Sequence, residues 1–440
     1  FYINFFIDIK MKKEIFTIQL GKCGIQTGHE FWKIISGEHL INPEGKVFFK
    51  KKFKSVGKKE IFFHETSKGN FVPRTFLFDL EPRALLGLLN GNYKNFYEKK
   101  NILFSKQGAG NNWANGYYKS FEFQPDIEEI LRKNLEICDN LGCFNIFHSI
   151  AGGTGSGAGS YIMEIIHDEF PRKFINCYST IPNRVDDLDT VIQPYNSILT
   201  FRWLDLYSDC VTFFENSALE KIIASSNQTI KINFQEINYL ISKIISISTE
   251  NVRFSENLNN SWENLSSFLI PTPKLHFLSA GISNLKIFNK KKKKPISKID
   301  LLKQVLENKT TSFLFNEGKL ISSLHFSKNR EQFLNEPYVL KKLYKEKKID
   351  YINWGSVPVY VTNPNKSIIN DHDKKEVWFY NHTKIKHLFS KTKNQYDVLR
   401  KRNAFLNNYL KNFPSNDGIE LFADARESIE NLLEEYKCAE

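Results

Sequence analysis

Apolar and polar residues follow two different periods along the first half of the chain. The segment EIFTIQL at residues 14–20 is a short, nearly continuous apolar run, which predicts a buried β-strand. Directly after it, large apolar residues recur between Ile25 and Ile35 at the spacing of one helix face. The glycine-containing stretch GKCG lies between the two periods. The pattern therefore predicts a strand, a glycine turn and a helix, the first unit of an α/β fold.

The same order of periods returns further along the chain. It occurs in TFLFDLEPRALLGLL at residues 75–89, and again in the strand-like CFNIFHSI at residues 143–150 with the helical pattern SYIMEIIHDEF at residues 160–170. Pro171 ends that helical pattern, and KFINCYSTIP at residues 173–182 predicts the next strand. This alternation over some 200 residues predicts a mostly parallel, doubly wound sheet.

The second half of the chain has a different character. One long helix is predicted from Phe234 to Thr249, and it looks like a connector. A new strand-bearing region begins at LIPTPKLHFLSAG, residues 269–281, and the last 60 residues or so carry helical patterns. We expect a smaller α/β region after the connector and a helical layer at the end.

Charge and cysteine usage restrict the function classes. The formal net charge of +12 suits a polyanionic partner, such as nucleic acid, an acidic protein tail or a membrane surface, but lysines on solvated faces explain it equally well. The six cysteines form no C-x-x-C pair, which argues against a zinc ribbon and a disulfide framework. No apolar run approaches the length of a membrane span, so we expect no membrane insertion. Residues 1–10 precede Met11 and are expected to be an upstream extension.

The stretch HSIAGGTGSGAGS, residues 148–160, carries the clearest chemical signal. A glycine-rich turn between a strand and a helix lets backbone N–H groups approach an anion, usually a phosphate. The P-loop template fails because Ala158 and Gly159 stand where Lys and Ser/Thr belong, and a G-x-G-x-x-A match through Gly153 gives only weak support to a dinucleotide-dependent oxidoreductase. Two more glycine stretches, GKCG and GAGNNWANGYY (residues 108–118), are expected to be loops at the same sheet edge. Together they predict a nucleotide site, with a mere tight turn as the alternative.

Several motifs give the chain a family resemblance. AGGTGSG (residues 151–157) resembles the tubulin signature, and GKCGIQ, DLEPR, QPYNS, LIPTPKLHFL and QYDVLRKRNAFL flank it in the expected order. Within that family FWKIISGEHLINPEG, GAGNNWANGY and YINWG look like γ-tubulin. The resemblance implies a tubulin-like α/β fold with a GTP-binding domain at residues 11–232, a core helix at 233–252, an intermediate domain at 253–383 and a C-terminal helical region at 384–440.

The resemblance also implies a site for GTP or GDP and for Mg²⁺. Asp79 and Glu81 stand where the family places magnesium-water ligands. No catalytic residue is implied. The residues implied around the phosphates, ribose and base are Lys22, Cys23, Gln26, Ala109, Gly110, Asn111, Ser149, Ala151, Gly152, Gly153, Thr154, Gly155, Ser156, Gly157, Asp189, Asn216, Phe234 and Asn238. For Cys23 and Phe234 a plain role in the core is the alternative.

Two departures from the family pattern affect the expected chemistry. Lys22 replaces an amide, and it either strengthens phosphate binding or points to solvent. Asn264 stands where α-tubulin has its hydrolytic glutamate, and Glu256 and Ser261 replace Gly and Asp nearby. Because Asn cannot act as a general base, this residue should not activate GTP hydrolysis in a neighbouring subunit.

The resemblance implies a γ-tubulin-like protein that templates microtubule nucleation, with at most weak GTPase activity. Its expected partners are ring-complex proteins, α/β-tubulin dimers and lateral copies of itself, at a cytoplasmic microtubule-organising centre or spindle pole. A nucleic-acid partner is not expected. The alternative within the family is an α/β-like lattice subunit that hydrolyses GTP in the polymer.

Overall fold

The protein was analysed as a computed structural model. It describes residues 13–48, 57–182, 191–227, 232–254, 261–283, 311–312, 318–327, 350–355, 359–362, 376–413 and 417–440. Asp189, Glu256 and the lysine clusters at 290–294 and 341–348 lie outside these residues, as do residues 1–12.

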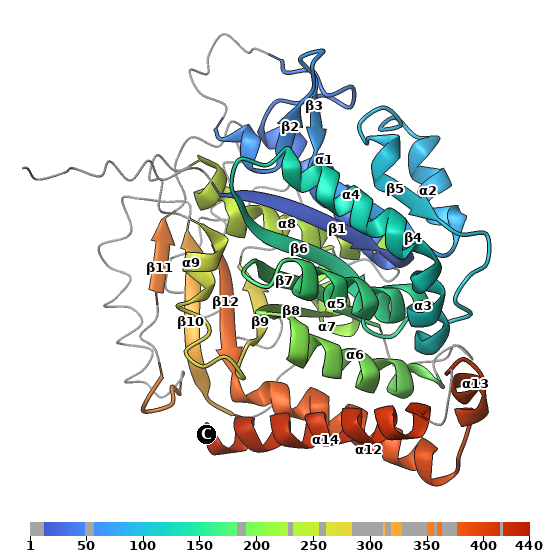
Figure 1. The fold of residues 1–440 in the computed structure, drawn as a ribbon. Coiled ribbons are helices and arrows are strands. Elements are labelled where there is room, and N and C mark those ends of the chain that lie inside the picture. Colours follow the sequence, from blue (N-terminus) through green and yellow to red (C-terminus); the bar gives the residue numbers. More distant parts are fainter. Residues whose placement is uncertain are drawn as a thin grey trace, which may run out of the picture.

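A ten-stranded sheet runs through the described part of the molecule, in the order β11-β10-β12-β9-β8-β7-β6-β1-β4-β5 (Figure 1). Its strands are β1 (Glu14–Leu20), β4 (Thr75–Asp79), β5 (Ile102–Phe104), β6 (Leu141–Ser149), β7 (Phe174–Ile181), β8 (Cys210–Glu215), β9 (Phe277–Ile282), β10 (Leu320–Ser327), β11 (Val359–Thr362) and β12 (Glu376–His382). A separate hairpin pairs β2 (Phe63–Glu65) with β3 (Phe71–Pro73).

Strand direction divides the sheet into two parts. From β5 to β9 all neighbouring strands are parallel, in agreement with the predicted doubly wound sheet. Strand β12 is antiparallel to β9 and to β10, and β11 is parallel to β10. The chain leaves β1 toward β4 on one side and reaches β6 on the other, so a topological switch point lies between β1 and β6. In open α/β sheets ligands bind outside the carboxyl ends of the strands at such a point.

Helices cover both faces of the sheet. One face packs against α1 (Gly21–Glu38), α2 (Pro82–Leu89), α7 (Asn216–Asn227) and α8 (Phe234–Phe254). The other face packs against α3 (Trp113–Ser120), α4 (Gln124–Glu136), α5 (Gly159–Glu169) and α6 (Gln193–Tyr207). The short α9 (Trp262–Ser266) follows α8, and 3₁₀ turns occupy Lys59–Ile61, Lys99–Asn101, Phe121–Phe123 and Thr383–Ile385. Two apolar clusters, one on each face, form the core.

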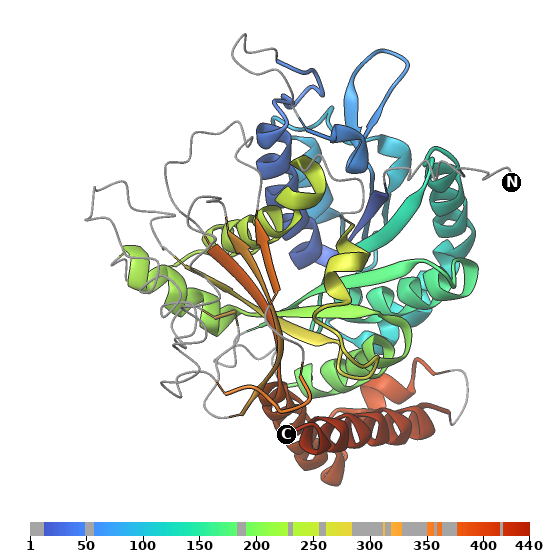
Figure 2. The ribbon, with the colours of Figure 1, turned by 90° about the vertical axis from the view of Figure 1, so that its left-hand side faces the viewer.

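The carboxyl-terminal helices form an outer layer, as the sequence predicts. They are α12 (Lys386–Lys401), α13 (Leu406–Leu410) and α14 (Asp417–Cys438). Figures 1 and 2 both show α12 and α14 at the bottom of the molecule, and both pack against α6. None of the helices in the described ranges is both long enough and apolar enough to cross a membrane.

Three local predictions need correction. GKCG is not a loop, because α1 begins at Gly21 directly after β1. GAGNNWANGYY is a loop only as far as Asn112, and α3 begins at Trp113. The helix after the glycine run begins earlier than its apolar pattern indicates, since a π-helical turn at Thr154–Ala158 leads directly into α5.

Candidate functional site

A cavity of about 440 Å³ lies at the carboxyl ends of β1, β4, β6 and β7. Helices α1, α7 and α8 begin at this cavity, and so does the helical turn within the glycine run. Since the amino end of a helix carries a partial positive charge and free N–H groups, this arrangement suits an anionic ligand. The residues that line the cavity are Leu20, Gly21, Lys22, Cys23, Gln26, Asp79, Glu81, Asn111, Ser149, Gly152, Gly153, Thr154, Gly155, Thr180, Pro182, Asn216, Phe234 and Asn238.

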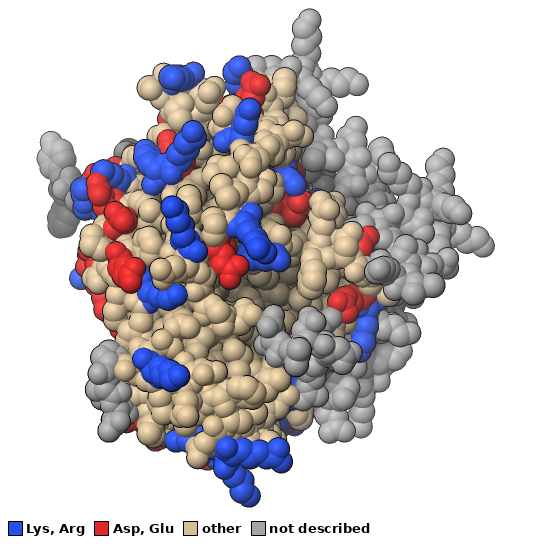
Figure 3. Space-filling view, turned by 90° about the vertical axis from the view of Figure 1, so that its right-hand side faces the viewer, with Lys and Arg blue, Asp and Glu red and all other residues tan. Residues whose placement is uncertain are grey.

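Charge on this side of the molecule is mixed. Figure 3 views the molecule from the side at which the parallel strands end. Lysine and arginine side chains are spread over the described part of this face with aspartate and glutamate among them. The described residues therefore do not form one large basic patch here, and the predicted ligand must be recognised inside the cavity.

The glycines of the run do two different things. A Cβ atom at Gly152 would meet nothing within 4 Å, so this residue borders open space at the cavity. A Cβ atom at Gly157 would lie 2.1 Å from the Trp113 carbonyl oxygen, and one at Gly116 would lie 2.2 Å from the Gly153 carbonyl oxygen. Glycine at these positions lets α3 pack directly against the helical turn. Part of the glycine run is therefore needed for packing and not for contact with a ligand.

Gly21 brings the amino end of α1 to the glycine run. Its φ of 66° lies in the left-handed region, where an L side chain is strained. A Cβ atom at Gly21 would lie 2.9 Å from the backbone nitrogen of Gly155. The backbones of the two segments are thus in close contact beside the cavity that both line.

His148 fixes the position of the glycine run. Its Nδ1 lies 3.1 Å from the Gly155 carbonyl oxygen, and its Nε2 lies 2.8 Å from the Ser179 hydroxyl. Burial lowers the pKa of His148 to about 4, so the ring is neutral at pH 7. In a neutral ring, Nδ1–H donates a hydrogen bond to the Gly155 carbonyl oxygen, and Nε2 accepts a hydrogen bond from the Ser179 hydroxyl. Both ring nitrogens are then satisfied.

The amide loop before α3 is tied to the rest of the site by Asn196. The buried Nδ2 of Asn196 donates to the carbonyl oxygens of Asn111 and Ala151, both at 2.7 Å. Its Oδ1 accepts from the Trp113 N–H at 2.8 Å and from the Tyr409 hydroxyl at 2.6 Å. One side chain of α6 therefore joins the loop, the glycine run, α3 and α13. The motif QPYNS contains this residue, but no local sequence pattern indicates its role.

Asp79 and Glu81 fit a magnesium ion that keeps water ligands. Asp79 is 2% exposed, and its Oδ1 accepts from the Glu81 N–H at 3.1 Å. Its Oδ2 has no hydrogen-bond partner among the described residues. Burial raises the pKa of Asp79 to about 6. No group of three or more His, Cys, Asp or Glu side chains suited to a metal occurs in the described part, so a cation here would need water and phosphate oxygens as further ligands.

Another group of lining residues, Asn216, Asn238 and Phe234, suits a flat base. Asn216, at the start of α7, is 7% exposed, and its Oδ1 has no hydrogen-bond partner among the described residues. The Oδ1 of Asn238 accepts from the Thr27 hydroxyl at 3.0 Å, which fixes this amide at the cavity wall. Phe234 is 68% exposed at the start of α8, so its alternative role as a core residue is wrong. An unpartnered acceptor and an exposed aromatic ring in the lining of one cavity suit a base with N–H donors.

Lys22, Cys23 and Gln26 line the cavity from the first turns of α1. Lys22 and Gln26 are exposed, and Cys23 is half-buried. Burial raises the pKa of the Cys23 thiol, so it stays protonated at neutral pH. Sequence reasoning missed Leu20, Gly21, Thr180 and Pro182. Thr180 and Pro182 follow from the pairing of β7 with β6, which brings the end of KFINCYSTIP beside the glycine run.

Some predicted site residues do not reach the cavity. These are Ala109, Gly110, Ala151, Ser156 and Gly157, of which Gly110 is exposed and the others are buried. The Ser156 hydroxyl donates to the Gly152 carbonyl oxygen, and Ala151 is held by Asn196. Ser156 and Ala151 therefore support the glycine run without lining the cavity.

Asn264 lies near the amino end of β1, away from the cavity. It belongs to α9, where the Ser261 side chain accepts from the Asn264 N–H at 3.2 Å. The neighbouring Glu263 pairs with Lys13, the residue before β1. Since Lys13 marks the amino end of β1 and the cavity marks its carboxyl end, Asn264 belongs to the face opposite the cavity.

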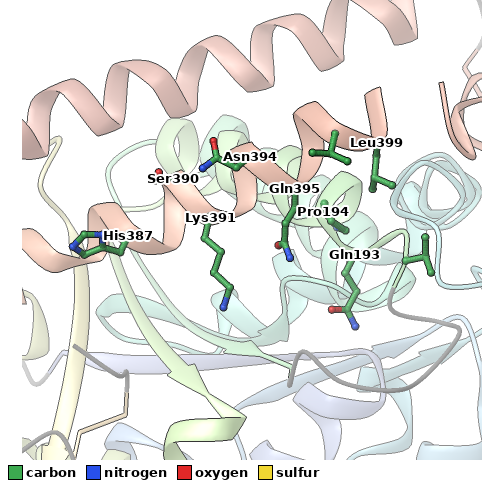
Figure 4. Close-up of a pocket in the computed structure, with 10 residues that line it drawn as sticks. Gln193, Pro194, His387, Ser390, Lys391, Asn394, Gln395 and Leu399 are labelled. Atoms are coloured by element: carbon green, nitrogen blue, oxygen red, sulfur yellow. The ribbon is translucent and has the colours of Figure 1, made fainter. Parts of the chain in front are cut away.

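A second cavity of about 740 Å³ lies between the start of α6 and α12 (Figure 4). Figure 4 shows His387, Lys391 and Gln395 on α12, with Pro194 of α6 beside Gln395 and Gln193 below it. None of the predicted nucleotide-binding or magnesium-binding residues lines it. The predicted residues therefore come together in the smaller cavity.

A comparison with protein-family models matches residues 14–224 to the Tubulin/FtsZ family, GTPase domain. The matched residues include β1 to β8, the glycine run and most of the cavity lining. The match agrees with the tubulin resemblance of the motifs and with the tubulin-like arrangement of the sheet and helices. Residues 14–224 of this chain belong to the Tubulin/FtsZ family as its GTPase domain.

Proposed function

We propose that this chain is a γ-tubulin-like protein that binds GTP or GDP and templates microtubule nucleation. The observation that carries the nucleotide part is the pair of unpartnered buried acceptors in one cavity, Asn216 Oδ1 and Asp79 Oδ2. Asn216 Oδ1 is suited to the N–H donors of guanine. Asp79 Oδ2 is suited to a magnesium ion that also binds the phosphates. The glycine run and the amino end of α1 supply backbone N–H groups for the phosphates.

The face that carries Asn264 favours a role as a template over a role in GTP hydrolysis. In a head-to-tail stack of such subunits, the face with α9 would approach the cavity of the next subunit. Asn264 offers no carboxylate that could accept a proton from water there. We infer a ring-complex partner on that face, α/β-tubulin dimers on the cavity face and further copies of the chain at the sides. A microtubule-organising centre or spindle pole in the cytoplasm is the corresponding location.

Nucleotide extraction tests the first part of the proposal. The purified chain should release GTP or GDP on denaturation, identified by chromatography and mass. Asn216→Ala should weaken guanine-nucleotide binding about tenfold or more, because a hydrogen bond inside the cavity is lost. The exposed Asn92 provides a control, and Asn92→Ala should leave binding unchanged. Absence of guanine nucleotide, together with no binding of added GDP, would refute this part.

Polymerisation kinetics test the second part. The chain, together with ring-complex proteins, should shorten the lag of α/β-tubulin assembly without forming filaments by itself. Self-assembly into filaments with stoichiometric phosphate release would instead support a lattice subunit. Restoring a carboxylate with Asn264→Glu should increase phosphate release only if a second subunit stacks on this face.

A further inference from the structure

Lys22 is a cation without a partner at the nucleotide cavity. It is the second residue of α1 and lines the cavity with an exposed side chain. It makes no hydrogen bond or ion pair with any residue in the described part of the chain. The other charged residues of the lining are Asp79 and Glu81, both acidic.

The position of Lys22 is unfavourable for the helix that carries it. The first turn of α1 contains no acidic residue, and no side chain caps its amino end. A lysine in the first turn is repelled by the positive end of the helix dipole. In the absence of a bound anion, Lys22 therefore does not stabilise the helix. A polyanion at this end would be attracted both by the helix dipole and by Lys22.

The geometry brings such an anion within reach of Lys22. The amino end of α1 meets the glycine run where Gly21 packs against the Gly155 nitrogen. An anion bound by the N–H groups of the run thus lies beside the first turn of α1. The buried unpartnered oxygens of Asp79 and Asn216 in the same cavity independently indicate a ligand there.

The two carboxylates of the lining give the cation a role. In the absence of a divalent ion, Asp79 and Glu81 repel the phosphates of a nucleotide. Among the described lining residues, Lys22 is the side chain that can offset this repulsion. Its long stem lets the ammonium group follow the terminal phosphate without a fixed geometry.

We propose that Lys22 binds the nucleotide phosphates and thereby makes nucleotide retention partly independent of magnesium. This inference rests on the proposed guanine-nucleotide site. It predicts a specific dependence on ligand charge. Lys22 should favour GTP and GDP over guanosine, and its contribution should be largest when no divalent ion is present.

Binding measurements with three ligands test the inference. The affinities of GTP, GDP and guanosine would be measured for the wild type, Lys22→Gln and Lys22→Arg, in Mg²⁺ and in EDTA. In EDTA, Lys22→Gln should weaken GTP and GDP binding by about tenfold or more, the usual range for loss of a charge-assisted hydrogen bond. In Mg²⁺ the loss should be smaller, and guanosine binding should not change. Lys22→Arg should restore most of the affinity.

Lys68 provides the control for a loss of net charge. It is exposed in the turn between β2 and β3, away from the cavity lining, so Lys68→Gln should leave all affinities unchanged. If the wild type binds the three ligands and Lys22→Gln binds them equally well in EDTA, Lys22 faces solvent and the inference fails alone. An equal loss for guanosine would assign Lys22 a structural role and would also overturn it. A wild type that binds none of the three ligands would instead refute the proposed function.

Discussion

At the scale of single residues, Gly152 and Gly157 show that one glycine-rich motif combines two physical requirements. Gly152 borders open space at the cavity, whereas Gly157 lets the Trp113 carbonyl oxygen approach within the distance that a side chain would occupy. Both look the same in the sequence. The two glycines differ only in their surroundings, because α3 packs against Gly157 and not against Gly152.

The two glycines should respond differently to the same substitution. Gly157→Ala places a methyl group against the α3 backbone and should lower the free energy of unfolding by about 2–3 kcal/mol or more, in the range of overpacking. Gly152→Ala should change it by less than about 0.5 kcal/mol. Urea unfolding of both variants measures this. Equal losses would show that the close packing of α3 is not maintained in solution.

Asp79 is expected to reduce stability in exchange for ligand binding. Its carboxylate is buried with one oxygen unpartnered among the described residues, and an uncompensated buried charge is costly. Asp79→Asn should therefore raise the free energy of unfolding of nucleotide-free protein by about 1–3 kcal/mol at pH 7. The same variant should weaken Mg²⁺-dependent nucleotide binding. A thermal shift series with and without Mg²⁺-GDP measures both, and a loss of stability in the free protein would contradict the expectation.

His148 should make stability depend on pH. Its folded pKa of about 4 lies below the ordinary value of about 6.5 for an unfolded chain. The unfolded state therefore binds the proton more tightly, and stability is lost as pH falls from about 6.5 toward 4. In His148→Gln the decrease in unfolding free energy between pH 7 and pH 5 should be smaller than in the wild type. The exposed His167 is the control, and an unchanged slope in His148→Gln would exclude this assignment.

At the scale of elements, the contacts of Asn196 connect segments that periodicity cannot connect. Asn196→Ala removes four hydrogen bonds, which join α6 to the amide loop, the glycine run, α3 and α13. The variant should lose about 2–4 kcal/mol of stability, since several buried partners are left unsatisfied. Hydrogen exchange should increase in the loop before α3 and in α13. Tyr409→Phe removes the hydroxyl bond to Asn196 and the longer one, 3.3 Å, to the Ile192 carbonyl oxygen, and it should cost about 1 kcal/mol.

A second prediction concerns the pairing of α1 with α8. The buried Glu38 of α1 accepts from Arg253 at 2.7 Å and lies 3.3 Å from the Lys243 Nζ of α8. Burial alone would raise the pKa of Glu38, but Arg253 and Lys243 hold it at about 2. Glu38→Gln leaves a buried guanidinium without its counter-charge and should cost about 3–5 kcal/mol. The exposed pair of Arg132 and Glu136 is the control, and Glu136→Gln should cost less than about 0.5 kcal/mol.

The sequence predicts the strands and helices that are determined by residues close together in the chain. The strands β1, β4, β6 and β7 follow from short apolar runs, and α5 follows from its apolar period and Pro171. Helix α3 was missed because its first residues include Asn115 and Gly116, which are typical of turns. One local and one non-local feature outweigh that preference: the Asn112 side chain caps the helix, and Gly116 packs on the distant Gly153 carbonyl oxygen.

The same distinction applies to the candidate site. Motif residues at strand ends, such as Asp79 and Gly152, line the cavity because the carboxyl ends of parallel strands meet there. Thr180 reaches the cavity only through the pairing of β7 with β6. Asn196 acts through contacts more than 40 positions away in the chain. The roles of Thr180 and Asn196 therefore cannot be predicted from the residues next to them in the sequence.

At the scale of the whole molecule, one sheet joins the GTPase domain to the region that follows α8. Strand β8 pairs with β9, and β9 pairs with β12, so backbone hydrogen bonds cross from one part to the other. We expect the two parts to unfold together. Pulsed hydrogen exchange along a urea titration should show peptides from β7 and from β12 losing protection at the same concentration. Two separate midpoints would show that the shared sheet does not make unfolding cooperative.

The outermost strands of the sheet have a consequence for how copies of the molecule can meet. In the described part, β5 at one margin has three residues and β11 at the other has four. So short a margin offers few free N–H and C=O groups to a strand from another chain, which is how many sheet proteins avoid joining edge to edge. The described margins of the sheet therefore favour ordered stacking through helices and loops. Such contacts can be reversed, whereas a sheet extended from chain to chain is very hard to take apart.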